Sequence, residues 1–98
     1  MKNIKIGVIG LGVGERHIVG YHQIEGVKVI GACDIDQQKL NDACDRQEVD
    51  NRYNDYRKLL EDPAIDAVSI CSYDNFHADQ IVDAFDAGKH VMCEKPIT

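Results

Sequence analysis

The chain lacks several features that mark other classes of protein. Its 98 residues hold no apolar run near the ~20 residues of a membrane span, and the N-terminus has no signal-peptide pattern. Basic residues number 11 against 17 acidic ones, for a net charge of −6, and no basic run occurs. We therefore expect a cytoplasmic protein with neither a membrane nor a nucleic acid as partner. Linkers, repeats and low-complexity segments are also missing, which favours one small domain.

The cysteines lack the spacing of a disulfide framework or a metal site. They stand at positions 33, 44, 71 and 93, without a C-x-x-C pair, and the four histidines do not cluster with them. We expect these cysteines to be small buried side chains in a reducing compartment, and we expect no metal.

What the chain does have is a regular alternation of strand and helix patterns. We expect strands over 4–9, 27–33, 49–53, 66–72 and 90–94. Helices are expected over 14–24 and 37–46, from Asn54 or Asp55, and between the loop 73–75 and Gly88. Such alternation predicts an α/β fold, a doubly wound parallel sheet of about five strands in the order 3-2-1-4-5, with helices on both faces. The ligand crevice of such a sheet lies at the carboxyl ends of strands one and four.

Two of the expected helices carry apolar side chains at helical spacing. In 14–24 the inward side is predicted from Val13, His17, Tyr21 and Ile24. In the last helix it is predicted from Ala78, Ile81, Val82 and Phe85. Asp36 is the expected N-cap of the helix over 37–46.

The first strand runs directly into a glycine-rich turn. Gly10, Gly12 and Gly14 form a G-x-G-x-G pattern, one residue tighter than the dinucleotide fingerprint, whose third glycine would fall on Glu15. Glycines allow a pyrophosphate to approach the backbone, and the following helix N-terminus attracts it. The turn alone leaves three readings open: a dinucleotide site, an S-adenosylmethionine site, and a loop that merely packs tightly.

An acidic residue closes the second predicted strand. Asp34 lies 24 residues after Gly10, near the spacing at which a carboxylate binds the adenosine ribose. Neither Ile35 nor Asp36 offers a positive charge to a 2′-phosphate, and the second carboxylate would repel one. The sequence therefore favours NAD over NADP.

The end of the chain carries a more specific pattern. Residues 87–96, Ala-Gly-Lys-His-Val-Met-Cys-Glu-Lys-Pro, resemble the A-G-K-H-V-x-x-E-K-P signature of the Gfo/Idh/MocA family of NAD(P)-dependent oxidoreductases. Residues 66–70 resemble the family's fourth strand, and 72–77 resemble its [ST]-P-N-x-x-H loop. This resemblance implies a dehydrogenase that transfers hydride between a nicotinamide cofactor and a secondary alcohol of a sugar or cyclitol-like substrate.

The resemblance also implies roles for particular residues. Gly10, Gly12, Val13 and Gly14 would bind the pyrophosphate, and Asp34 the ribose.

Ser72 and His77 would line the nicotinamide side of the crevice. Glu94 and Lys95 would lie where nicotinamide meets substrate, with Lys95 as the catalytic residue contacting the reacting hydroxyl. An acid–base residue of a following substrate domain would complete proton transfer.

Three departures from the family pattern qualify these expectations. The first turn is contracted, Tyr73 stands in place of proline, and Asp74 stands in place of asparagine. Family members also continue well beyond the position of Thr98, so we expect residues 1–98 to be an incomplete N-terminal dinucleotide-binding domain without its substrate domain. Such a fragment would bind NAD without turnover, and its uncovered last strand favours a homo-oligomer. A non-catalytic nucleotide-binding or regulatory module is the alternative.

Overall fold

The computed structural model describes residues 4–71 and 74–93, which form five strands and four helices in alternation. The strands are β1 (Ile4–Ile9), β2 (Val27–Cys33), β3 (Asn51–Tyr53), β4 (Ala67–Ile70) and β5 (His90–Cys93). The helices are α1 (Leu11–His22), α2 (Gln37–Gln47), α3 (Tyr56–Leu60) and α4 (Asp74–Asp86).

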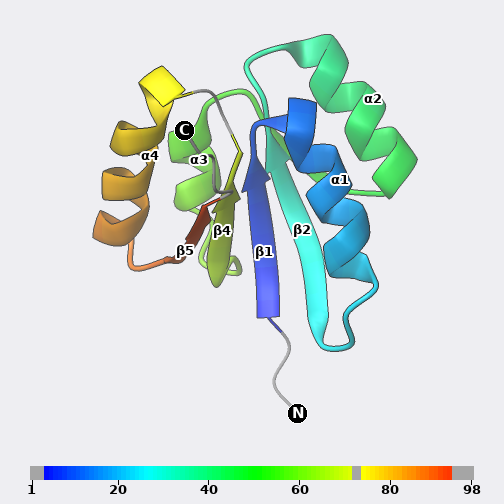
Figure 1. The fold of residues 1–98 in the computed structure, drawn as a ribbon, viewed down its shortest axis with the longest axis horizontal. Coiled ribbons are helices and arrows are strands. Elements are labelled where there is room, and N and C mark those ends of the chain that lie inside the picture. Colours follow the sequence, from blue (N-terminus) through cyan, green and yellow to red (C-terminus); the bar gives the residue numbers. More distant parts are fainter. Residues whose placement is uncertain (1–3, 72–73, 94–98) are drawn as a thin grey trace.

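All five strands are parallel, in the order β3-β2-β1-β4-β5, which confirms the predicted sheet. Helices α1 and α2 cover one face, and α3 and α4 cover the other (Figure 1). The chain leaves β1 toward β2 on one side and returns to β4 on the other. The carboxyl ends of β1 and β4 therefore form the switch point at which ligands bind in such sheets.

Capping residues set several element boundaries where the sequence predicts them. Asp36 begins α2 by accepting hydrogen bonds from the backbone N–H groups of Gln38 and Lys39. Asp55 begins α3 in the same way, by accepting from the N–H of Arg57. Gly88 follows α4 with φ 78°, the left-handed conformation that ends helices.

Each face of the sheet has its own apolar core. On the α1/α2 face Val8, Ile18 and Leu40 are almost completely buried. On the α3/α4 face Leu59 and Ile70 are fully buried. Parallel sheets need both faces covered, because their strands are apolar on each side.

The first helix differs from the prediction in its start and in its buried side. It begins at Leu11 rather than near residue 14, so the later glycines of the turn belong to the helix itself. Leu11 and Ile18 are buried, and Tyr21 packs against the same core as predicted, whereas Ile24 lies beyond the end of the helix and is 52% exposed. Leu11, Ile18 and Tyr21 are spaced seven and three residues apart and so share one face of the helix. The side chain of Val13 lies outside the described part.

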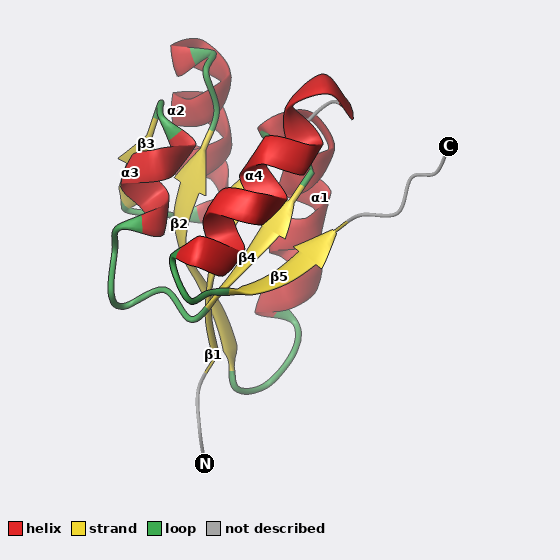
Figure 2. Cartoon of the chain, turned by 90° about the vertical axis from the view of Figure 1, so that its left-hand side faces the viewer, coloured by secondary structure: helices red, strands yellow, loops and turns green. Residues whose placement is uncertain are grey.

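The buried side of α4 was also predicted wrongly in part. Ile81 packs against the core, but Val82 and Phe85 are 56% and 64% exposed, and Ala84 is the fully buried residue. The side chain of Ala78 lies outside the described part. Helix α4 contacts α3, β4 and β5 at the border of the sheet (Figure 2), so only part of its apolar stripe meets a neighbour.

Candidate cofactor-binding site

A single residue, Gly10, joins β1 to α1. Its φ of 89° lies in the region that favours glycine, and its own N–H donates to the carbonyl of Cys33 at 2.9 Å. Gly12, Val13 and Gly14 follow within the first turn of α1. The G-x-G-x-G pattern is therefore one tight connection followed by the opening of a helix.

The start of α1 presents the features of an anion site. No side chain of Gly10 caps it, and its first turn contains no acidic residue. The N–H groups of a first helical turn lack partners within the helix and carry its positive dipole end. A phosphate group would therefore be held by backbone donors here.

Glu15 stands in place of the fingerprint's third glycine, and side chains of the neighbouring helix balance its negative charge. Arg46 donates to both of its carboxylate oxygens at 2.8 Å, and Gln47 donates at 3.0 Å. The hydrogen bond from Arg46 is the main reason why the pKa of Glu15 lies below its ordinary value. The residue thus links α1 to α2 and its charge is balanced.

Asp34 lies directly against the glycine turn. Its Oδ2 accepts from the N–H of Leu11 at 2.9 Å, and its Oδ1 accepts from the N–H of Asp36 at 2.9 Å. The preceding Cys33 is buried, and this burial, with the nearby Asp34 and Asp55 charges, raises its pKa to about 12. That thiol therefore stays protonated and uncharged at neutral pH.

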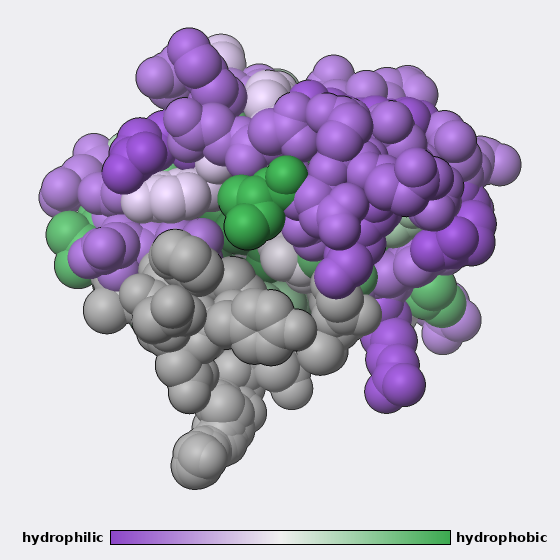
Figure 3. Space-filling view, turned by 90° about the horizontal axis from the view of Figure 1, so that it is seen from above, coloured by the Kyte–Doolittle hydropathy of each residue, from purple (hydrophilic) through white to green (hydrophobic). Residues whose placement is uncertain are grey.

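An exposed apolar side chain follows the carboxylate. Ile35 is flanked by charged residues, and its side chain is 81% exposed. Seen from above, toward the carboxyl ends of the strands, the described residues form a mostly hydrophilic surface around a small hydrophobic area (Figure 3). A helix N-terminus, a carboxylate and an apolar side chain in succession fit the pyrophosphate, ribose and adenine of a dinucleotide.

The residues predicted for the nicotinamide side are largely outside the described part of the chain. Ser72, Glu94 and Lys95 fall there, and so does the side chain of His77, whose backbone belongs to α4. Their roles remain predictions. Within the described residues, Ser69 of β4 is buried and accepts a hydrogen bond from the Tyr21 hydroxyl of α1 at 3.0 Å.

One lysine of the A-G-K-H-V pattern has a structural task. The Nζ of Lys89 donates to the backbone carbonyls of Asp62 and Ile65, each at 2.7 Å. It therefore fastens the loop that enters β4 to the start of β5. This contact explains why the pattern has a lysine at this position without assigning that lysine a catalytic role.

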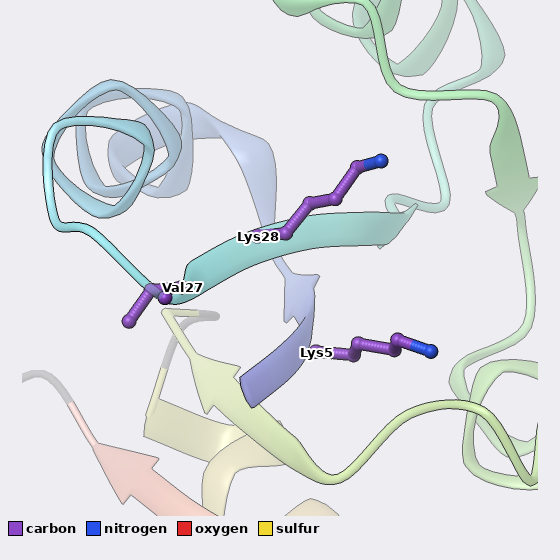
Figure 4. A pocket seen from close by; sticks show the side chains of 4 residues that line it. Lys5, Val27 and Lys28 are labelled. Atoms are coloured by element: carbon purple, nitrogen blue, oxygen red, sulfur yellow. The ribbon is translucent and has the colours of Figure 1, made fainter. Parts of the chain in front are cut away.

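A pocket of about 280 Å³ lies at the other end of the strands from the candidate site (Figure 4). Lys5, Gly26, Val27 and Lys28 line it, at the amino ends of β1 and β2. It is separated from Gly10 and Asp34 by the length of the strands. It is not part of the cofactor crevice.

The comparison with protein families matches nearly the whole chain. Residues 4–98 fit the model described as the oxidoreductase family with an NAD-binding Rossmann fold, named for Gfo, Idh and MocA. The chain belongs to the Gfo/Idh/MocA family. This result confirms the NAD-binding Rossmann domain expected from the sequence, and it does not favour the S-adenosylmethionine alternative.

Among curated Gfo/Idh/MocA relatives, the oxidoreductase YrbE of Bacillus subtilis is 38% identical over 98 residues, covering 99% of this chain. The myo-inositol 2-dehydrogenase of Thermotoga maritima is 35% identical over 96 residues, covering 97%. The scyllo-inositol dehydrogenase of Lactobacillus casei, solved with NAD(H) and scyllo-inositol, is 37% identical over 97% of this chain, with a TM-score of 0.90. The chain spans 29%, 29% and 28% of these three proteins, respectively.

Sequence reasoning did not consider two groups next to Asp34 as candidate members of the site. The N–H of Leu11 contacts Asp34, but a backbone donor leaves no signal in a sequence. Ile35 was considered only for its lack of charge, although an exposed isoleucine directly after the strand-end acid was a usable signal.

Within the described residues, none of the helices is long and apolar enough to cross a bilayer.

Proposed function

We propose that this domain binds NAD for an enzyme that oxidises a secondary alcohol of a cyclitol or a similar sugar. The observation that supports it most is the contact between Asp34 and the first N–H of α1, which joins a candidate ribose ligand to a candidate pyrophosphate site. Relatives named as inositol dehydrogenases support the cyclitol class. The residues that we propose for the adenosine half of the site lie within the described part of the chain.

The proposed preference for NAD rests on charge. The Asp34 carboxylate can accept hydrogen bonds from ribose hydroxyls, whereas a 2′-phosphate at the same position would meet a like charge. Asp36 adds a second carboxylate two residues away, held at the start of α2. Both effects act on the adenosine end of the cofactor.

The proposed chemistry places Lys95 at the reacting hydroxyl. When bound, NAD⁺ supplies the hydride acceptor. The Lys95 ammonium would stabilise the negative charge that develops on the alcohol oxygen, and Glu94 would lie with it where nicotinamide meets substrate. The A-G-K-H-V-x-x-E-K-P pattern supports this assignment.

A titration of the 98-residue chain tests the cofactor. We expect binding of NADH, weaker binding of NADPH, and none of S-adenosylmethionine. Asp34→Asn removes the charge but keeps an acceptor, so NADH affinity should fall on the order of tenfold and the preference over NADPH should shrink. Asp50→Asn, an exposed site just before β3, is the control and should change neither affinity. Equal affinities of the unmodified chain for NADH and NADPH would contradict the role of Asp34.

The substrate class is tested on the protein encoded by the complete reading frame. Oxidation of myo-inositol and scyllo-inositol by NAD⁺, followed through NADH absorbance, should be detected and should be lost in Lys95→Met. Cofactor binding should persist in this variant, because Asp34 and the glycine turn are unchanged. NADH binding with no oxidation of any cyclitol or sugar would overturn the proposed substrate.

A further inference from the structure

The start of α1 is held by a residue from another element. Gly10 has no side chain to cap the helix, and the first helical N–H, that of Leu11, donates instead to the Asp34 carboxylate 23 residues away. The preceding N–H, that of Gly10, donates to the Cys33 carbonyl. The end of β2 therefore binds two successive donors of the turn.

Asp34 is itself fixed from several directions. Its second oxygen accepts from the N–H of Asp36, its own N–H donates to the Tyr53 carbonyl at 3.1 Å, and its carbonyl accepts from the Asn54 side chain at 3.2 Å. The carboxylate therefore has a defined position before any ligand arrives. Because each carboxylate oxygen can accept two hydrogen bonds, both oxygens retain capacity for ribose hydroxyls.

We infer that Asp34 is a positioning residue for the pyrophosphate site, in addition to its proposed contact with ribose. By supplying the missing cap of α1, it holds the first helical turn in the orientation in which its N–H groups meet a phosphate. The two halves of the adenosine-diphosphate site are then coupled through one side chain. Loss of the Asp34 acceptor weakens phosphate binding even when no ribose is present.

The inference rests on the proposed function for the identity of the ligand, and its test separates the two. Asp34→Asn and Asp34→Ala are both uncharged, but only asparagine retains an oxygen that can accept from Leu11. Hydrogen exchange of the Leu11 amide is measured by NMR in both variants without ligand. Affinity for inorganic pyrophosphate, which has no ribose, is then measured in both.

We expect the Leu11 amide to exchange on the order of tenfold faster in Asp34→Ala than in Asp34→Asn. Pyrophosphate should bind several-fold more weakly to the alanine variant. The amides of Val8 and Ile70, in the sheet, serve as internal references for overall stability. If the alanine variant does not fold, Asp34→Leu replaces it, because leucine has the shape of asparagine without its acceptor.

Equal Leu11 exchange and equal pyrophosphate affinity in the two uncharged variants would overturn the inference and leave Asp34 a ribose ligand alone. Faster Leu11 exchange in the alanine variant with equal pyrophosphate affinity would show a structural cap alone and would also overturn the inference. Faster exchange together with weaker pyrophosphate binding supports the positioning role even if the chain fails to bind NADH. In that case the proposed function fails separately.

Discussion

At the scale of single residues, the site depends on one backbone conformation. Gly10 is the only residue between β1 and α1, and it adopts φ 89°. A side chain there would meet the steric cost that L-residues pay at positive φ. Gly10 also leads directly into the first turn of α1, so one substitution there tests both the fold and the proposed phosphate site.

Gly10→Ala should lower the free energy of unfolding by about 1–2 kcal/mol and weaken NADH binding. Chemical denaturation and a cofactor titration measure the two effects. Gly20→Ala is the matched control, because an added Cβ at Gly20 meets no atom within 4 Å. In the interior of α1 it should instead stabilise by about 0.5–1 kcal/mol. If both substitutions stabilised the chain, the positive φ of Gly10 would carry no constraint.

At the scale of elements, a loop without regular structure is tied to the sheet by one side chain. The segment between α3 and β4 offers two carbonyls, of Asp62 and Ile65, to the half-buried Lys89 ammonium. Asp66, at the end of this segment, in turn accepts from the N–H of Lys5 and of His90. The entrance to β4 is thus held from β1 and β5.

Lys89→Met keeps the length of the side chain but removes both of these hydrogen bonds. It should lower the free energy of unfolding by about 2 kcal/mol, which corresponds to a Tm roughly 10 °C lower. Thermal unfolding measures the change, with Lys39→Met on the exposed side of α2 as the control. A loss of NADH affinity without a loss of stability would contradict the structural role of Lys89.

At the scale of the whole molecule, the titration of Cys33 and Tyr56 makes the stability depend on pH in the alkaline range. Burial raises the pKa of Cys33 from 9.0 to about 12. The hydrogen bond from its hydroxyl to Asp83 raises the pKa of Tyr56 from 10.0 to about 12. Above pH 9 the unfolded chain releases these protons while the folded chain retains them, so the free energy of unfolding decreases as pH rises.

The Tm should therefore fall continuously between pH 9 and 12. Cys33→Ala and Tyr56→Phe should each make this decline shallower, because each removes one group that titrates differently in the two states. Thermal unfolding across that range, with Cys44 left in place, measures the slope. An unchanged slope in both variants would show that other groups cause the decline.

The order of the strands could be predicted because it depends on local patterns and a general rule. Asp36, Asp55 and Gly88 mark boundaries through hydrogen bonds and dihedral angles within a few residues. The exposure of Val82 and Phe85 could not be predicted, since helical spacing shows that a stripe is apolar but not whether a neighbour reaches it.

The sequence by itself determined the α/β class, the glycine turn, the acid that closes β2, and membership of an NAD-binding family, because each depends on residue type and short spacing. Tertiary structure alone decided that Asp34 caps α1 through Leu11, that Arg46 neutralises Glu15, and that Lys89 supports a loop. These contacts join residues 23 to 31 positions apart. Their existence depends on how β1 and β2 pair and how helices cross the sheet, which no local pattern specifies.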